Sequence, residues 1–195
     1  MKNIKLLSLV LLFLGTYSCK EAKKEAKDTM ENVEAMAEEI KEEIEVKTLK
    51  FSLEPKSDSN VKGEVSFTEE NGTVSMNANL SGLTPGEHAI HIHEKADCSS
   101  ADGKSTGGHW NPTFAPHGKW GSTEGYHRGD IGNFTADAEG NATVEFSTDE
   151  WCLGCGDETK NLIGKGVIVH QGEDDFVTQP TGDAGGRISC AGIIE

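Results

Sequence analysis

The sequence predicts an all-β domain of about eight strands, a Greek-key β-sandwich or barrel with two long functional loops, from residue 48 to the C-terminus. Short runs of alternating apolar and polar residues follow one another, and turn residues separate them. No long helical period occurs after residue 48, and the 23 glycines fit a turn-rich β protein. Residues 94–131 and 171–187 are polar, glycine-rich loops. Loops of this length in a compact domain are usually either functional or disordered, and most of the histidines lie in or beside these two.

The first 19 residues predict an export signal. Lys2 and Lys5 accompany an apolar run that ends at Leu14, too short for the roughly 20 residues that span a bilayer. The segment Gly15-Thr16-Tyr17-Ser18-Cys19 resembles the cleavage box of a bacterial lipoprotein, so we expect Cys19 to carry a lipid. The alternative is an ordinary signal peptide cut nearby. We therefore expect an exported, membrane-anchored lipoprotein, in the periplasm or at the cell surface.

Residues 20–47 predict a charged helical tether. They contain six lysines and ten acidic residues, with no glycine or proline. Their apolar residues recur at spacings of three and four, as one narrow helical stripe requires: Ala22, Ala26, Met30, Val33, Ala37, Ile40 and Ile44. Such a segment acts as a semi-rigid spacer between membrane and domain. A short coiled coil with a partner is the alternative, although the alanines weaken that seam.

The net charge of −15 excludes one class of partner. Residues 1–19 carry +2 and residues 20–47 carry −4, so −13 falls on residues 48–195. Nucleic acids are bound mainly through lysine and arginine contacts to phosphate, so we expect no nucleic-acid partner.

The predicted strands follow in chain order as alternating or apolar runs at residues 49–53, 65–67, 74–80, 89–93, 132–136, 142–146, 167–170 and 188–194. Glu70-Asn71-Gly72 and Glu139-Gly140-Asn141 are typical of hairpin turns. Four cysteines lie in this domain: Cys98, Cys152, Cys155 and Cys190. In an exported protein disulfides are the expected state, but spacing alone does not choose among the three pairings.

The histidines are the feature that points to chemistry. His91 and His93 lie two residues apart in a predicted strand, so they share one face while Ile90 and Ile92 point to the core. Paired imidazoles suit a divalent transition metal. Alone, such a pair is more often two surface histidines; the histidines elsewhere in the chain favour the metal.

The first long loop adds a second set of ligand types, namely His109, His117, His127 and Asp130. Three imidazoles and a carboxylate form a complete tetrahedral set for zinc. His170 ends a predicted strand just before the second long loop, where it can close a site with His91 and His93.

Five motifs together resemble the copper/zinc superoxide dismutase family, and the match covers nearly all of residues 48–195. They are His91-Ile92-His93, Gly108-His109-Trp110-Asn111-Pro112, His127-Arg128-Gly129-Asp130, His170 with Asp174-Asp175, and the run from Thr181 to Cys190. Residues 94–104 resemble the bacterial branch of the family in particular.

The resemblance implies copper and zinc as cofactors and the superoxide anion as substrate. The implied copper ligands are His91, His93, His109 and His170. The implied zinc ligands are His109, His117, His127 and Asp130, with His109 bridging the metals. The other implied residues are Asp174 bonded to outer ligand nitrogens, His88 in a structural role, Arg187 beside copper, and a Cys98–Cys190 disulfide.

The implied reaction is dismutation of superoxide to oxygen and hydrogen peroxide, with His109 also carrying a proton. The alternatives are a non-catalytic copper or zinc carrier of the same fold, and a structural lipoprotein. Because the family contains dimers as well as monomers, a homodimer is compatible with the sequence.

Two features need separate hypotheses. A domain at −13 repels an anionic substrate, so attraction must be local, and Lys95, Lys104 and Lys119 are the candidate steering residues. The alternative is that they are solvated surface lysines. For Cys152 and Cys155 we expect a local disulfide; a reduced thiol pair and a weak metal site are the alternatives.

Overall fold

The computed structural model describes residues 46–195, so the predicted signal, the lipidation site Cys19 and nearly all of the tether lie outside the described residues. Within that range the chain forms one 3₁₀ turn, η1 (Lys104–Thr106), and eight strands. The strands are β1 (Lys47–Pro55), β2 (Lys62–Glu70), β3 (Thr73–Ser81), β4 (Gly86–His93), β5 (Gly132–Ala136), β6 (Ala142–Thr148), β7 (Gly166–His170) and β8 (Arg187–Gly192). The predicted all-β fold class is confirmed.

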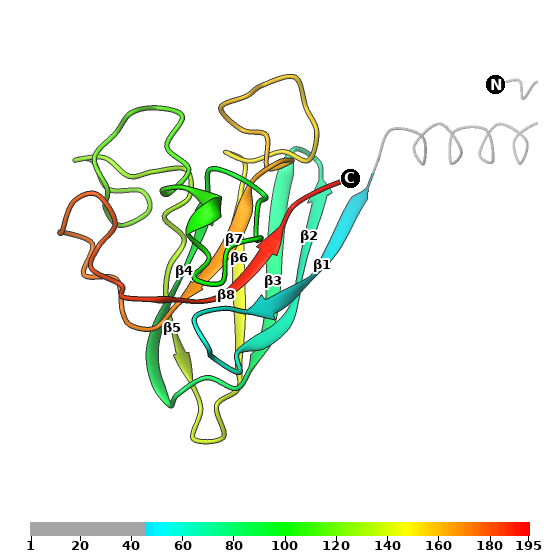
Figure 1. The fold of residues 1–195 in the computed structure, drawn as a ribbon. Helices are drawn as coiled ribbons and strands as arrows, with labels where there is room; N and C mark the ends of the chain where they lie inside the picture. Colours follow the sequence, from blue (N-terminus) through cyan, green and yellow to red (C-terminus); the bar gives the residue numbers. More distant parts are fainter. Residues whose placement is uncertain (1–45) are drawn as a thin grey trace, which may run out of the picture. The chain divides into compact units, whose positions relative to one another are not determined.

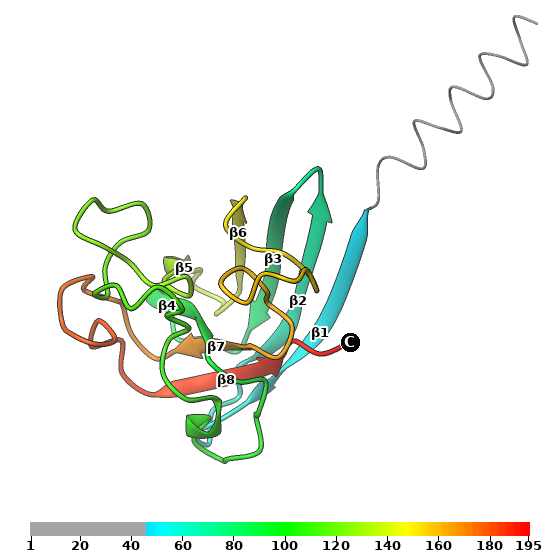
Figure 2. The same ribbon diagram turned by 90° about the horizontal axis from the view of Figure 1, so that it is seen from above.

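The strands form one antiparallel sheet in the order β5-β4-β7-β8-β1-β2-β3-β6, which curls until β5 and β6 approach each other as a nearly closed barrel (Figures 1 and 2). The Greek-key character comes from β4 and β7, which pair although the whole of β5 and β6 lies between them in sequence. Strand β1 joins the two halves, because it pairs along its length with β2 and only at Glu54 and Pro55 with β8.

Strand β3 shows how the sequence pattern builds the core. Val74, Met76, Ala78 and Leu80 are buried, and the residues between them are more exposed. Side chains alternate between the faces of a strand, so a period of two places every apolar residue of β3 on the inner face. Removing that apolar surface from water supplies much of the driving force for folding.

Strand β4 departs from this pattern, because it is buried on both faces. Ile90 and Ile92 pack into the core, as predicted, while His91 and His93 point outward under the long loops. Both long loops are hydrogen-bonded to this strand: the N–H of Ile92 donates to Gly129 O (2.9 Å), and the N–H of Ala89 donates to Gly172 O (2.9 Å). A Cβ at Gly129 would collide with the carbonyl oxygen of Ile92, so the close approach requires glycine.

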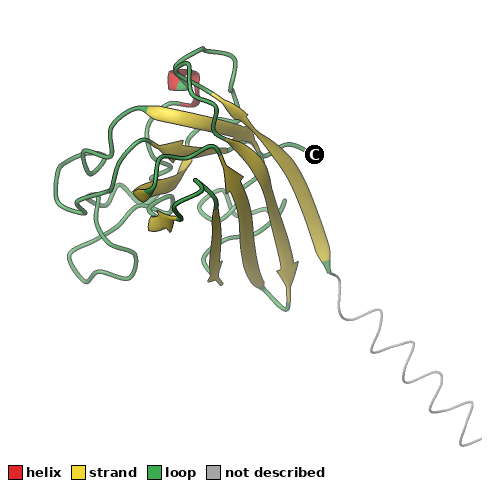
Figure 3. Ribbon diagram, turned by 90° about the horizontal axis from the view of Figure 1, so that it is seen from below, coloured by secondary structure: helices red, strands yellow, loops and turns green. Residues whose placement is uncertain are grey.

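The long loops gather on one side of the barrel (Figure 3). The Cys98–Cys190 disulfide ties the first of them to β8, with Cα atoms 5.9 Å apart. A Cys152–Cys155 disulfide closes a turn in the connection between β6 and β7. Across residues 46–195 we find no helix with the length and apolarity needed to cross a bilayer.

Candidate metal centre

The first ligand set joins side chains from three parts of the fold. Strand β4 supplies two histidines, the first long loop one, and the end of β7 one. One ring nitrogen of each lies within 4.8 Å of the others, and all four residues are buried: His91, His93, His109 and His170.

Hydrogen bonds decide which ring nitrogen of each histidine is free. His91 Nε2 donates to Asp174 Oδ2 (2.9 Å), and His93 Nδ1 donates to the carbonyl oxygen of Gly107 (3.0 Å). His170 Nδ1 lies 3.5 Å from the carbonyl oxygen of Gly185. A neutral imidazole has a single N–H, so the other nitrogen of each ring has a lone pair that is free to bind a metal ion.

The free nitrogens of this set point at one another. Burial, followed by repulsion from neighbouring histidines and Arg187, holds the pKa of His93 and of His170 well below the ordinary value, so both rings are neutral. Their Nε2 atoms lie 3.4 Å apart. Among the described residues, His91 Nδ1 and His109 Nε2 are buried without a hydrogen-bond partner. Converging lone pairs repel one another unless a cation lies between them, and an all-imidazole set suits copper.

The second ligand set surrounds the carboxylate of Asp130. The Nδ1 atoms of His109, His117 and His127 lie 2.9, 3.0 and 3.2 Å from its oxygens. Despite these distances, and within the described part of the chain, Nδ1 of His117 and of His127 lacks hydrogen-bond geometry. These nitrogens therefore point at a common centre beside the carboxylate, which fits the tetrahedral N and O set of zinc.

The electrostatics of the second set favour positive charge. Burial opposes protonation of His117, but the adjacent carboxylate of Asp130 and the hydrogen bond to Asp174 outweigh it and raise its pKa to about 9. Burial by itself would raise the pKa of Asp130, but the three adjacent histidines and the backbone N–H of His127 hold it far below the usual range. Burial lowers the pKa of His109 to about 4, despite its bond to Asp130. The same field favours a bound dication.

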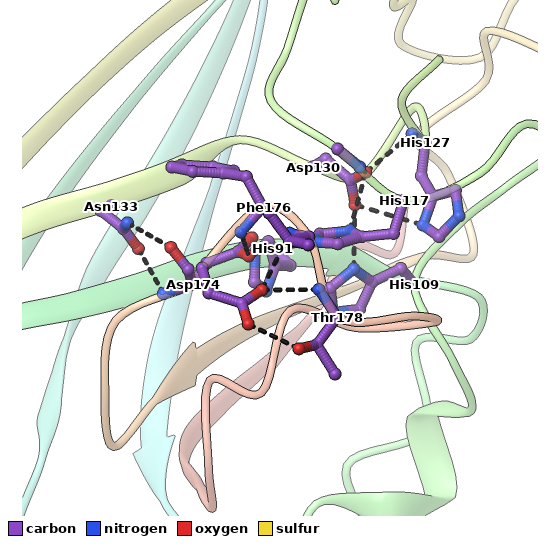
Figure 4. A network of polar contacts seen from close by, with 12 residues as sticks. His91, His109, His117, His127, Asp130, Asn133, Asp174, Phe176 and Thr178 are labelled. Atoms are coloured by element: carbon purple, nitrogen blue, oxygen red, sulfur yellow. Dashed lines mark hydrogen bonds and ion pairs between the residues drawn. The ribbon is translucent and has the colours of Figure 1, made fainter. Parts of the chain in front are cut away.

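Asp174 links the two sets, as Figure 4 shows. Its Oδ1 accepts a hydrogen bond from His117 Nε2, and its Oδ2 accepts one from His91 Nε2, each at 2.9 Å. Asn133 holds the backbone of Asp174 on both sides: its Oδ1 accepts from the N–H (2.7 Å), and its Nδ2 donates to the carbonyl oxygen (2.8 Å). One buried carboxylate therefore orients one ring of each set, a role that usually tunes metal affinity.

Two residues that the sequence did not single out, Gln179 and Gly182, also support the site. Gln179 Oε1 accepts from the N–H of His117 (2.8 Å), and Gln179 Nε2 donates to its carbonyl oxygen (2.9 Å). Gly182 has a φ of +70°, and a Cβ there would collide with Asp174 and His117. A single glycine within the run from Thr181 to Cys190 is a weak signal in sequence, and nothing marked Gln179.

Arg187 is the cation that the structure fixes near the first set. It lies opposite His170 in the β7–β8 pairing, just past an irregularity in the register. Its Nη1 donates to the carbonyl oxygen of Gly103 and to Thr106 Oγ1, each at 3.0 Å. The half-buried guanidinium is thus held by η1, and the disulfide at Cys190 anchors the same strand.

The three candidate steering lysines are exposed. Lys104 lies in η1, next to the residues that hold Arg187, and forms an exposed ion pair with Asp102 (3.2 Å). The backbone N–H of Lys95 donates to Thr106 O (2.9 Å), so these two lysines flank the Arg187 support. Lys119 lies on the loop of the second set, two residues after His117.

The fold is a β-barrel that carries two buried groups of side chains, each able to hold a metal ion, and the two groups share His109. Residues 61–193 match the family described as copper/zinc superoxide dismutase (SODC). The chain belongs to this family, and the resemblance seen in its motifs is confirmed.

Solved structures give the same relationship. A double mutant of a SOD-like protein from Bacillus subtilis is 30% identical, covers 75% of this chain and 97% of its own, and has a TM-score of 0.67. The SOD-like protein from Bacillus subtilis is 28% identical, with 74% and 97% covered and a TM-score of 0.66. The clock protein EA4 is 32% identical, with 75% and 94% covered and a TM-score of 0.65.

Proposed function

We propose that this protein is a superoxide dismutase that uses copper in the first ligand set and zinc in the second. The observation that carries the proposal is the shared histidine: His109 offers Nδ1 to the Asp130 set and a buried, unpaired Nε2 to the all-imidazole set. Family membership supports superoxide as the substrate.

Copper would supply one-electron redox chemistry, whereas zinc has none. The reaction converts two superoxide anions and two protons into one oxygen molecule and one hydrogen peroxide. The residues of the chain provide two other functions, which are binding the anion and moving a proton.

Arg187 is the residue that we assign to anion binding. Its guanidinium is fixed by two hydrogen bonds from one nitrogen, which leaves other N–H groups to donate. Charge-assisted hydrogen bonds from a fixed guanidinium orient an anion better than a mobile lysine does.

His109 Nε2 is the atom that we assign to proton transfer. In the site it faces the first ligand set and has no protein hydrogen-bond partner within residues 46–195. A nitrogen in that position can accept a proton and deliver it to the departing peroxide, while Nδ1 stays directed at the second set.

Local positive charge must overcome the repulsion between the superoxide anion and the net charge of −13 on residues 48–195. We assign this to Arg187, to bound metal charge and to Lys95, Lys104 and Lys119, because focused local fields act over a Debye length of about 8–10 Å.

We also propose the exported lipoprotein form. It comprises a signal at residues 1–19 with lipid on Cys19, a tether at 20–47 and the catalytic domain at 48–195. The two disulfides within the described residues suit an extracellular or periplasmic protein. Labelling with a radioactive fatty acid and its loss in Cys19→Ala tests the anchor; sedimentation tests the homodimer.

The enzyme proposal is tested by loading the protein with copper and zinc, measuring bound metal, and assaying superoxide dismutation, with His109→Ala as control. We expect activity in the loaded wild type and a large loss in the variant. No activity with both metals bound would refute the enzyme and favour the carrier. A carrier needs the ligands but not Arg187, so an Arg187 variant that binds metals normally and loses activity separates the two.

A further inference from the structure

The loop that bears the second ligand set packs against a segment that contributes no ligand of its own. Strand β6 ends at Thr148, and the next residues, Glu150 and Trp151, lie against the loop that bears His117 and His127. This segment belongs to the β6–β7 connection, the yellow-to-orange loop in Figure 1.

Glu150 contacts both chain neighbours of His127. The hydroxyl of Tyr126 donates to Oε1 and Oε2 of Glu150 (2.8 and 3.0 Å), and the guanidinium of Arg128 forms an ion pair with the same carboxylate. The side chains of Arg128 and Glu150 are only 20% and 30% exposed. A mostly shielded pair is less screened by solvent and salt than a surface pair.

The ring of Trp151 also contacts the chain next to His127. Its Nε1 donates to the carbonyl oxygen of Arg128 (2.9 Å), and the side chain is 1% exposed. The ring packs against Phe146 (centroids 5.0 Å apart) and Trp120 (5.8 Å), and Trp120 packs on Tyr126 (4.9 Å). Trp120 and Tyr126 both lie between His117 and His127 in the chain, so this aromatic cluster immobilises the loop between two ligands.

The segment itself is rigidly attached to the barrel. The N–H of Glu150 donates to Thr148 Oγ1 at the end of β6 (3.0 Å), and the N–H of Leu153 donates to Glu69 Oε2 on β2 (2.8 Å). A fixed platform can impose a geometry on the loop that the polar loop would not hold by itself.

We propose that Glu150 is a positioning residue for the zinc site: by binding Tyr126 and Arg128 it fixes His127 between them. The inference rests on the proposed zinc function of the second set. Groups that orient metal ligands typically contribute 10–100-fold in affinity, and Glu150 acts one residue further out, so about tenfold is expected.

The test measures zinc release from the metal-loaded full-length protein to a coloured chelator. Glu150→Ala is expected to release zinc about tenfold faster, and Glu150→Gln and Tyr126→Phe by a smaller factor, because each leaves part of the contact in place. Glu64→Ala is the matched control, since Glu64 forms an exposed ion pair with Lys50 on the sheet. Copper release should change less than twofold in every variant.

A second readout separates positioning from general destabilisation. Cobalt(II) in the zinc set has a visible absorption that reports ligand geometry, and it should change in Glu150→Ala and stay unchanged in Glu64→Ala. Wild-type zinc release in both Glu150→Ala and Tyr126→Phe overturns the inference, and so does an equal acceleration of zinc and copper release. If Glu150→Ala does not fold, Tyr126→Phe decides. A wild-type protein that retains no zinc refutes the zinc function itself, which is a different result.

Discussion

Removal of the Cys98–Cys190 disulfide is expected to destabilise the fold far more than removal of Cys152–Cys155. A disulfide restricts the unfolded chain, and in the chain-entropy account the effect grows with the logarithm of the loop that it closes. The sequence separations are 92 and 3. The loop-entropy relation then gives about 4.6 kcal/mol for the long loop and about 1.6 kcal/mol for the short one, a difference of about 3 kcal/mol.

The assay is denaturant unfolding of metal-free protein, because bound metals would add stability that depends on their concentration. The variants are Cys98→Ala with Cys190→Ala, and Cys152→Ala with Cys155→Ala. Each pair joins a buried cysteine to a more exposed one, since Cys190 is 0% and Cys152 5% exposed. The packing lost with the sulfur atoms is therefore similar, and the loop length remains as the difference.

Equal losses of unfolding free energy in the two double variants would refute the loop-length reasoning. A larger loss in the Cys152 and Cys155 variant would show instead that the β6–β7 connection depends on its disulfide for native packing. An altered denaturant slope would show that the compactness of the unfolded or native chain, or the two-state character of unfolding, had also changed. The two losses are therefore compared only between variants with equal slopes.

Four further outcomes are expected. Asp174→Asn lowers affinity for both metals about 10–100-fold, measured as metal retained after dialysis; retention of both metals would contradict its linking role. Arg187→Gln lowers kcat/KM about tenfold or more with metal content unchanged, because a charged hydrogen bond contributes about 1.5–3 kcal/mol. Gly182→Ala weakens zinc binding and destabilises the fold by more than the penalty of about 1–2 kcal/mol for a left-handed backbone alone. Gly121→Ala measures that penalty as the control, because Gly121 has a similar φ and open space around it. Lys104→Gln reduces the salt dependence of kcat/KM, whereas an unchanged dependence would exclude it from steering.

Much of the fold could be predicted because it follows from local rules. The alternation in β3 places its apolar side chains on one face, and the same rule puts His91 and His93 together on β4. Strand ends were predicted less well. The last strand was expected to run to residue 194 but ends at Gly192. Opposite Ile193, the N–H of Lys165 donates to Leu162 O (3.1 Å) instead of to β8, so the regular ladder stops there.

The ligand types could also be predicted, since few functions other than metal binding explain histidines at such spacings. The supports of the site could not. Gln179 and Glu150 are ordinary polar residues in sequence, and each acquires its role by lying beside a loop 24 or more residues away in the chain. The cysteine pairing had the same limit, because spacing alone allowed three arrangements and the barrel brings Cys98 to Cys190 across 92 residues.

The sequence by itself determined which residues could bind metals and which faces of the strands they occupy, because alternation and residue chemistry are local properties. Only the tertiary structure decided which nitrogen of each histidine is free. That choice is made by partners on other segments: Asp174 binds Nε2 of His91, and the carbonyl oxygen of Gly107 binds Nδ1 of His93. Such partners become neighbours only when the barrel closes and the long loops fold over β4, so the direction of each lone pair is a property of the folded chain.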